Sequence, residues 1–214
     1  MILAKENFTA VLSRLWRLWA TVLCFVIFGL CSVLLSLFWF RLLPHVVTNR
    51  ERRVRLARRS ISLSFKIFLQ LCRCLGFFDY KFEGLEELRP ERGIVLAANH
   101  PTFLDYVLIA LQLPEVDCII KSGLERNFFL SSMIGTADYL INSRHEELLP
   151  LSSQRLQSGE CILIFPEGTR TVPGQELRVR RGCAQIALRC RCEERGSHPD
   201  PLQRAICGQK YEVV

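Results

Sequence analysis

The residues from Leu18 to Phe40 form an apolar run that contains no charged side chain. As a helix, at about 1.5 Å per residue, the run would be about 35 Å long, which is enough to cross a hydrocarbon core of about 30 Å. Three tryptophans stand near its ends, where aromatic side chains often meet the membrane–water interface: Trp16, Trp19 and Trp39. A cleaved signal peptide is the alternative, but the run is long for one and no small-residue cleavage site follows. We predict a transmembrane helix at about residues 18–40.

Arginines are concentrated just after this run. They are Arg41, Arg50, Arg52, Arg53, Arg55, Arg58 and Arg59, whereas Lys5, Arg14 and Arg17 precede it. By the positive-inside rule, the chain after the helix faces the cytoplasm, which predicts a location at the cell (inner) membrane. A net charge of +7 suits either nucleic acid or an anionic membrane. The juxtamembrane position of the arginines favours anionic lipid, so membrane lipids are the expected partners and nucleic acid is not expected.

A second apolar stretch runs from Ile61 to Phe78. Its polar residues Lys66, Gln70 and Arg73 are spaced by four and three, so they share one face of a helix whose remainder is apolar. Such a helix lies in the membrane interface or packs on the domain core, and the pattern allows both. Gly76 is the predicted helix end. Residues 1–79 are therefore predicted to be an N-terminal membrane-anchoring region.

Two short apolar runs each lead directly into a polar motif. Residues 93–98 precede Asn99-His100-Pro101-Thr102-Phe103-Leu104-Asp105, and residues 161–165 precede Pro166-Glu167-Gly168-Thr169-Arg170. Both runs are typical of buried strands. Because the carboxyl ends of parallel strands meet at one edge of a sheet, we expect the two motifs to share a cleft. Further strands are expected at residues 80–84, 117–120 and 139–141, and helices at 101–113, 123–133, 145–157 and 180–190.

His100 and Asp105 are the predicted catalytic pair. A neutral imidazole works as a base near pH 7 when a carboxylate fixes its tautomer and orientation. With Pro101 as a first helical residue, Asp105 lies about one turn along that helix and can fold back toward the ring. A hydrogen-bonded histidine at a strand end is the alternative. The Gly-x-Ser-x-Gly nucleophile elbow is absent, so the base must act on a substrate.

The second motif combines an acid, a glycine and an arginine. Gly168 lets the backbone approach a ligand closely, and the planar guanidinium of Arg170 suits phosphate. Taken alone, the motif is also compatible with a strand-ending turn in which Glu167 and Arg170 form a surface ion pair.

Together, the Asn-His-x4-Asp and Phe-Pro-Glu-Gly-Thr-Arg motifs, in this order, resemble those of the glycerolipid (lysophospholipid) acyltransferase family typified by 1-acylglycerol-3-phosphate acyltransferase. The resemblance covers residues 80–191. It implies that a fatty acyl group moves from acyl-CoA or acyl carrier protein to the hydroxyl of a lysophospholipid, as in phospholipid biosynthesis, with the acyl donor as a substrate and no resident cofactor. The implied substrate-binding residues are Glu167, Gly168, Thr169, Arg170, Arg144 and Lys121.

The chain departs from the family pattern at two places. Ser143 stands where the family has an acid and Asp138 where a glycine is common, which makes another lipid acceptor credible. Residues 192–214 are too polar and proline-rich for the strands that the family has there, so these strands are apparently missing. A truncated, non-catalytic membrane protein therefore stays an alternative. So does a thioesterase that uses the His100–Asp105 pair on water.

The ten cysteines lack the spacing of a zinc site or a disulfide framework, so we expect no metal and no disulfides. The predicted fold is an α/β domain at residues 80–191, with a mixed, mainly parallel sheet flanked by helices. The membrane-anchoring region precedes it, and an atypical tail at 192–214 follows it.

Overall fold

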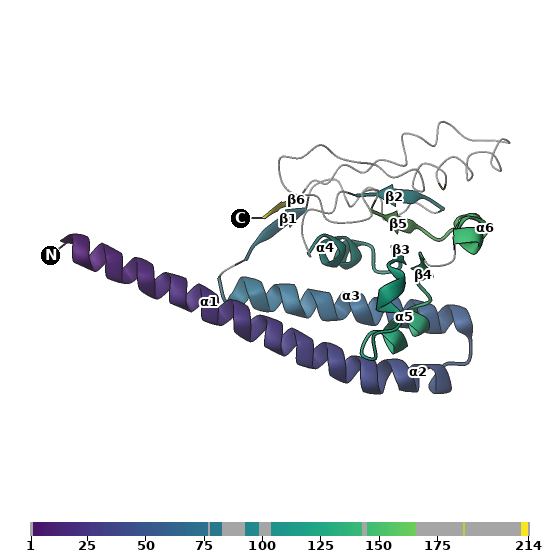
Figure 1. Cartoon of the computed structure of the whole chain (residues 1–214), viewed down its shortest axis with the longest axis horizontal. Coiled ribbons are helices and arrows are strands. Elements are labelled where there is room, and N and C mark those ends of the chain that lie inside the picture. Colours follow the sequence, from purple (N-terminus) through teal and green to yellow (C-terminus); the bar gives the residue numbers. More distant parts are fainter. Residues whose placement is uncertain are drawn as a thin grey trace.

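The computed structural model describes residues 2–76, 78–82, 93–98, 104–142, 145–165, 186 and 211–213. Its α-helices are α1 (Ile2–Leu34), α2 (Phe40–Val46), α3 (Arg50–Cys74), α4 (Asp105–Gln112), α5 (Ser131–Ala137) and α6 (His145–Gln157). Its strands are β1 (Tyr80–Phe82), β2 (Val95–Ala97), β3 (Asp117–Ile120), β4 (Leu140–Ile141), β5 (Ile162–Ile164) and β6 (Tyr211–Val213). α3 lies between the long helix α1 and the sheet domain (Figure 1).

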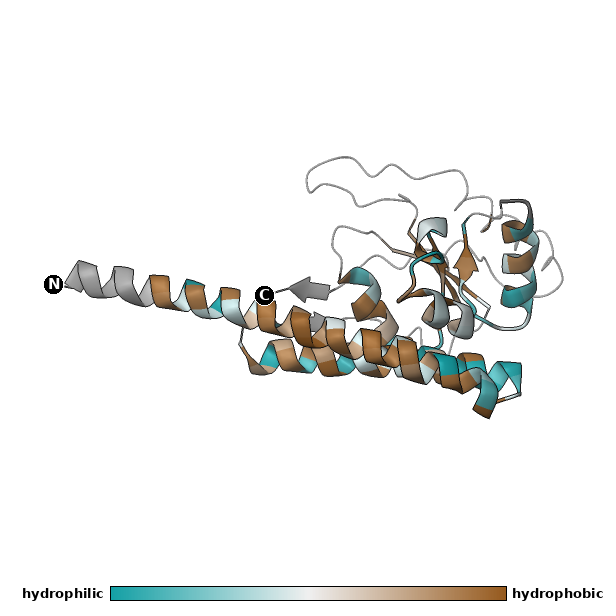
Figure 2. Cartoon of the chain, turned by 60° about the horizontal axis from the view of Figure 1, so that its bottom comes forward, coloured by the Kyte–Doolittle hydropathy of each residue, from teal (hydrophilic) through white to brown (hydrophobic). Residues whose placement is uncertain are grey.

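The predicted membrane segment lies within one long helical rod. α1 continues through a π-helical turn, η1 (Leu35–Trp39), into α2. The stretch Val11–Val46 is long and apolar enough to cross a membrane, and only 11% of its apolar 18-residue window is buried within the protein. Figure 2 shows apolar residues along most of the described part of this rod and along much of α3. Such a large exposed apolar surface is typical of a protein that contacts lipid or a partner.

α3 is longer than the sequence predicted. It begins at Arg50, where the side chain of Asn49 caps the helix by accepting a hydrogen bond from the Arg52 amide at 3.0 Å. It ends next to Gly76, as predicted, which has a left-handed φ of 71°. One face of α3 packs against α1 and α4, while Lys66, Gln70 and Arg73 are exposed on the other. α3 is therefore a packed helix of the domain as well as an amphipathic one.

The central sheet is parallel, with the strand order β2-β5-β3-β4. A parallel sheet flanked by helices is the predicted α/β fold. A separate antiparallel pair joins β1 to β6, with Tyr80 opposite Val213. β6 lies in the tail, for which the sequence predicted no strand.

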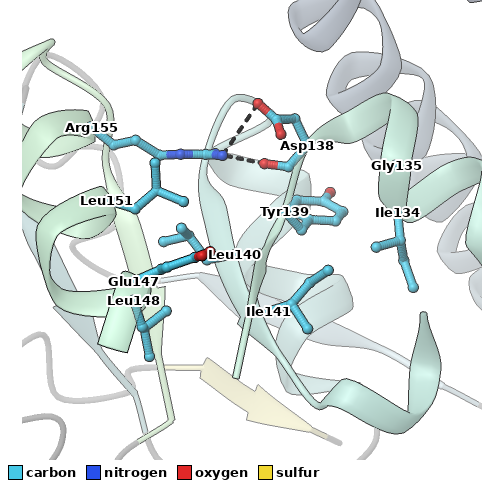
Figure 3. A pocket seen from close by; sticks show the side chains of 10 residues that line it. All are labelled: Ile134, Gly135, Asp138, Tyr139, Leu140, Ile141, Glu147, Leu148, Leu151 and Arg155. Atoms are coloured by element: carbon cyan, nitrogen blue, oxygen red, sulfur yellow. Dashed lines mark hydrogen bonds and ion pairs between the residues drawn. The ribbon is translucent and has the colours of Figure 1, made fainter. Parts of the chain in front are cut away.

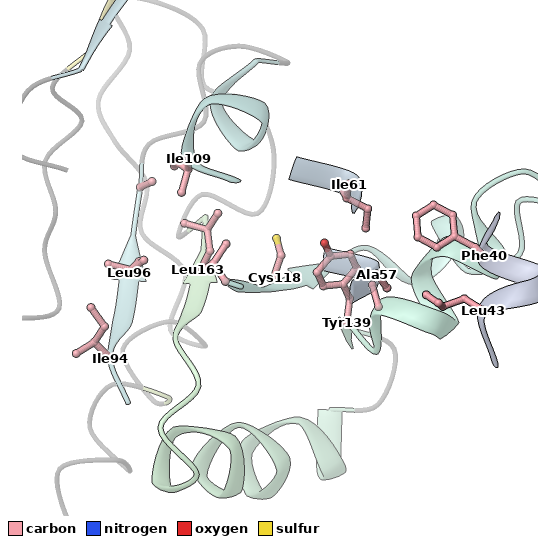
Figure 4. Close-up of a cluster of buried hydrophobic side chains, with 13 residues drawn as sticks. Phe40, Leu43, Ala57, Ile61, Ile94, Leu96, Ile109, Cys118, Tyr139 and Leu163 are labelled. Atoms are coloured by element: carbon pink, nitrogen blue, oxygen red, sulfur yellow. The ribbon is translucent and has the colours of Figure 1, made fainter. Parts of the chain in front are cut away.

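Both faces of the parallel sheet are covered, as buried parallel sheets require. Leu96 and Leu163 face a cluster that includes Ile61 of α3 and Ile109 of α4 (Figure 4). The neighbouring strand residues point the other way and pack with Leu156 of α6. This second cluster also holds Ile186, the described residue of the helix predicted at 180–190. The alternation of sides along β2 and β5 follows from the two-residue period of a strand.

The structure confirms some predicted helices and corrects others. α6 has the predicted bounds, and Gly159 just after it has a left-handed φ of 82°. The helix predicted at 123–133 is wrong: a short 3-10 turn, η3 (Ser122–Leu124), and further turns precede α5. α4 begins at Asp105, and residues 101–103 lie outside the described part of the chain.

Candidate active site

The last described residues before the two motifs lie on neighbouring strands. β2 and β5 pair in parallel with Ala97 opposite Ile164, and the Ala98 amide donates to the Ile164 carbonyl at 3.1 Å. Ala98 immediately precedes the first motif, and Phe165 immediately precedes the second. The structure therefore brings the starting points of both motifs together at the carboxyl edge of the sheet, which is where parallel sheets bind ligands.

Asp105 is the first residue of α4 and is fully buried. An acidic residue in the first turn of a helix is stabilised by the helix dipole. Burying a carboxylate is unfavourable unless it is hydrogen-bonded or paired, so a buried Asp105 is suited to holding a neighbouring group in place rather than to contacting bulk water. The sequence predicts that this group is the imidazole of His100, and this role stays a prediction because His100 lies outside the described residues.

The residue after Asp105 anchors α4 to the rest of the domain. The Tyr106 hydroxyl donates to the Tyr139 hydroxyl at 2.7 Å, and the two rings meet edge to face with their centroids 6.4 Å apart. Burial raises the pKa of Tyr106 well above its usual value, and it raises the pKa of Tyr139 as well. Both hydroxyls therefore stay protonated at neutral pH. This pair has no signal in the sequence, because its two members lie 33 residues apart.

The other two strands of the sheet end at the same edge. Lys121 follows β3 and is exposed. Asn142 follows β4, and its amide donates to the Ile120 carbonyl at 2.9 Å. The strand order thus places Lys121 beside the end of β5, in keeping with a contact to an anionic substrate. Asp138, before β4, has a left-handed φ of 55°, which explains why glycine is common there in the family that the chain resembles.

Most of the predicted site residues lie outside the described residues. They are His100, Glu167, Gly168, Thr169, Arg170 and Arg144. Their roles remain predictions, as does the expected absence of a metal. Among the residues that the structure does describe, no three His, Cys, Asp or Glu side chains are grouped as metal ligands would be.

A pocket of about 210 Å³ is lined by residues of α5, β4 and α6 (Figure 3). Its walls include Ile134, Ile141 and Leu148. Its arginine, Arg155, is already engaged, because its guanidinium donates to the Asp138 carbonyl at 2.6 Å and pairs with the Asp138 carboxylate at 3.2 Å. The pocket therefore combines apolar walls with the acids Asp138 and Glu147, and its arginine is paired within the protein rather than available to an anionic ligand.

Arg58 was predicted to face lipid, and the structure corrects this. It is buried, its guanidinium lies 3.3 Å from the Asp117 carboxylate, and it donates to Glu160 at 2.9 Å. Burial alone would lower the pKa of Arg58, but the two carboxylates raise it above its usual value. Two exposed arginines of α3 also pair with the domain, Arg50 with Asp138 and Arg59 with Glu115. Part of the basic cluster therefore docks α3 onto the sheet.

An acyltransferase family model matches residues 79–200 of this chain. The chain belongs to the acyltransferase family. The matched region includes both motifs and the two neighbouring strands, β2 and β5, that lead into them.

Two curated acyltransferases are similar in sequence. A 1-acyl-sn-glycerol-3-phosphate acyltransferase from Chlamydomonas reinhardtii is 32% identical over 128 residues, which cover 55% of this chain and 37% of that protein. A 1-acyl-sn-glycerol-3-phosphate acyltransferase from Pseudomonas aeruginosa is 26% identical over 124 residues, which cover 55% of this chain and 48% of that protein. The matched region spans less than half the length of either relative.

The fold also resembles that of a solved acyltransferase. The 1-acyl-sn-glycerophosphate (LPA) acyltransferase PlsC from Thermotoga maritima superimposes with a TM-score of 0.65 at 21% identity, covering 81% of this chain and 71% of that chain. At this identity the likeness establishes the α/β fold and leaves the reaction to be argued from the site.

Proposed function

We propose that this acyltransferase moves a fatty acyl group from acyl-CoA or acyl carrier protein to the hydroxyl of a lysophospholipid such as 1-acylglycerol 3-phosphate. The observation that carries the proposal is the buried Asp105 at the start of α4, next to two parallel strands whose ends lead into the Asn-His-x4-Asp and Pro-Glu-Gly-Thr-Arg motifs. The names of the two curated relatives support the same acceptor.

The proposed reaction is a direct transfer. His100 removes the proton from the acceptor hydroxyl while the oxygen attacks the thioester carbonyl carbon. Asp105 orients the imidazole and stabilises the imidazolium, and backbone donors near Gly168 hold the developing oxyanion. The carbon–sulfur bond then breaks, and the departing thiolate takes the proton from the imidazolium. Glu167 and Arg170 position the acceptor, Arg170 by pairing with its phosphate.

The test is an assay of the purified chain with acyl-CoA, with and without 1-acylglycerol 3-phosphate. We expect free thiol and phosphatidate to appear in equal amounts, and to appear only when the acceptor is present. Thiol and free fatty acid released without acceptor would make the protein a thioesterase. No thiol release from a compact, protease-resistant protein would make it a non-catalytic relative. Transfer to another lysophospholipid alone would keep the chemistry and change the acceptor.

We further propose that α1 and α3 attach the enzyme to the membrane together. α1 and η1 run beside α3. At one end of the contact the Trp16 indole donates to the Leu75 carbonyl at 3.4 Å, and at the other the Trp39 indole donates to Ser60 at 3.0 Å. α3 also packs on α4, where Phe65 meets Tyr106 with ring centroids 5.8 Å apart. If residues 16–39 crossed the bilayer, α3 and α4 would also lie at the depth of the hydrocarbon core. The packing therefore favours a helix pair that lies in the interface with its outer face in lipid.

Two measurements test this attachment. The protein should stay with membranes after washing with high salt and carbonate, because salt screens arginine–phosphate attraction but not apolar burial. In sealed vesicles that expose the catalytic domain, a tag placed before Met1 should be accessible to protease. A protected tag would instead establish a spanning helix with its N-terminus on the far side, and release in the washes would leave only peripheral binding.

A further inference from the structure

The loop between η3 and α5, residues 124–130, exposes three large apolar side chains. Leu124 is 42% exposed, Phe128 is 59% exposed and Phe129 is 47% exposed. The two phenyl rings pack edge to face with their centroids 5.4 Å apart, so they form one apolar surface rather than isolated residues. Contiguous exposed apolar side chains usually mark a contact surface.

Hydrogen bonds hold this loop in its exposed position. The Asn127 side chain accepts from the Phe129 amide at 2.9 Å, and the Asn127 carbonyl accepts from the Ser131 amide at 2.8 Å. The Ser36 hydroxyl of η1 donates to the Phe129 carbonyl. The backbone that carries the two rings is therefore fixed to the long N-terminal helix.

The loop packs against one side of the helical stretch formed by η1 and α2, and it enlarges the exposed apolar face of that stretch. The Arg41 guanidinium is 5.2 Å from the centre of the Phe128 ring, and its Nε donates to Ser132 at 3.4 Å. The opposite flank is occupied by α3, through the hydrogen bond between Trp39 and Ser60. Between the two flanks, exposed apolar residues of the same helical stretch continue the surface: Leu34, Phe38 and Leu42.

Exposed basic residues accompany the three apolar side chains, within the loop, just before it and on the neighbouring helix. Lys121, Arg126 and Arg41 are exposed, and Glu125 is the one acid within the loop. Aromatic side chains at the depth of the headgroups, bordered by cations that pair with phosphate, are the combination that suits the surface of an anionic bilayer.

We propose that the 124–130 loop is a lipid-contacting element, in which Leu124, Phe128 and Phe129 enter the interface of an anionic bilayer while Lys121, Arg126 and Arg41 contact lipid phosphates. This inference deepens the proposed attachment through α1 and α3 and rests on it. It adds a third point of contact on the other flank of α1. Because Lys121 directly follows β3, the loop also links the carboxyl edge of the sheet to the lipid surface.

The test is photo-crosslinking of the full-length chain in vesicles of phosphatidylethanolamine and phosphatidylglycerol that contain an alkyne-labelled lipid. The photoreactive residue p-benzoylphenylalanine replaces Phe128 in one variant. It replaces Phe38, on the outer face of the helix, in a positive control. It replaces Leu151 of α6 in a matched control, because Leu151 is also apolar and 37% exposed but belongs to the helix on the far face of the sheet.

We expect position 128 to form lipid adducts at a level similar to position 38 and about tenfold above position 151, because only the first two would be surrounded by lipid. The Arg126→Gln change, or replacement of phosphatidylglycerol by phosphatidylcholine, should lower the yield at position 128 and not at position 38. If position 38 forms lipid adducts but the yield at position 128 is no higher than at position 151, the loop proposal is overturned and the helix attachment is kept. Labelling at none of the three would overturn both, and a protein–protein adduct at 128 would make the surface an interface between copies of the chain.

Discussion

The two edges of the central sheet use charged residues in different ways. At the amino edge, Asp117 starts β3, Asp138 precedes β4 and Glu160 precedes β5. These acids pair with Arg58 from α3 and Arg155 from α6. At the carboxyl edge, β2 and β5 lead into the two motifs, and α4, which packs on these strands, begins with the buried Asp105.

The difference separates charges that hold the fold from charges to which we assign a role in the proposed reaction. At the amino edge, each acid forms an ion pair with an arginine, and the pairs connect α3 and α6 to the sheet. These charged groups are therefore neutralised within the protein. Breaking a buried pair is strongly destabilising because it leaves an uncompensated charge. At the carboxyl edge, polar groups follow the strands at the place where parallel sheets bind their ligands. Substitutions at the two edges should therefore give opposite defects.

The largest effect is expected at the carboxyl edge. His100→Ala removes the proposed general base, so kcat/KM should fall by about 10²- to 10⁴-fold, and by more if the acceptor is also misplaced. Asp105→Asn keeps the size of the side chain but favours the wrong imidazole tautomer, so it should lower the rate by a similar factor. Thiol release measures the rate, and circular dichroism shows whether the fold is kept. Near-normal transfer by His100→Ala would refute the general-base role.

The opposite defect is expected at the amino edge. Asp117→Asn leaves Arg58 and Arg155 buried without their shared carboxylate, which should lower the free energy of unfolding by about 3–5 kcal/mol. Chemical denaturation in detergent micelles measures the loss, and the folded fraction should keep its turnover rate.

Glu115→Gln is the matched control for this change. Its carboxylate pairs with the exposed Arg59 at 2.6 Å, and its own side chain is 35% exposed. Loss of such a surface pair should lower the free energy of unfolding by less than about 1 kcal/mol. If both variants were equally stable, the buried network would not be what docks α3.

The sequence was informative where local pattern decides the structure. Apolar runs predicted the strands that became β2, β3 and β5, and the first turn and final glycine predicted α6. It was misleading where distant partners decide. Arg58 looked like a lipid-facing arginine because its partners Asp117 and Glu160 lie far along the chain. The start of α3 was missed because arginines dominate its first turns, although Val54 and Ala57 extend the apolar period of Ile61 toward the N-terminus.

The same distinction applies to the site. That two strand-and-motif units share an edge follows from sequence because parallel strands end on the same side. The burial of Asp105 and the contact between Tyr106 and Tyr139 required the fold, since a local sequence pattern does not show which distant residues pack around a side chain. The helix predicted at 123–133 failed for a related reason. Asn127 there caps a turn through its side chain, which competes with helical hydrogen bonding.

A smaller, substrate-dependent effect is expected at Arg170. If it binds phosphate through its planar fork, Arg170→Lys should raise the acceptor KM several-fold, because a point charge cannot copy two parallel hydrogen bonds. The defect should be larger for 1-acylglycerol 3-phosphate than for an uncharged lipid acceptor. Equal effects on both acceptors, or a change confined to the donor KM, would instead make Arg170 a structural partner, most simply of Glu167.

The smallest effect is expected where the fold supports the site. Tyr106→Phe removes the donor of the 2.7 Å hydrogen bond to Tyr139 and leaves the Tyr139 hydroxyl buried without this partner. The free energy of unfolding should fall by about 1–3 kcal/mol. The rate should fall a few-fold, with an unchanged acceptor KM, because Asp105 is the neighbouring residue of α4.

The double variant Tyr106→Phe/Tyr139→Phe sharpens this last prediction, because it removes both partners at once. It should be more stable than Tyr106→Phe alone, since no buried hydroxyl is left unsatisfied.

The pH dependence of stability gives a second readout of the tyrosine pair. Because burial raises the pKa of both tyrosines in the folded state, the folded protein holds these protons more tightly than the unfolded chain does. The associated stability is complete below about pH 10, the usual tyrosine pKa, and is lost as the pH rises through the higher folded-state values. The wild type should therefore lose stability above pH 10 more steeply than the double variant. Equal slopes would show that the pair does not stabilise the start of α4 in this way.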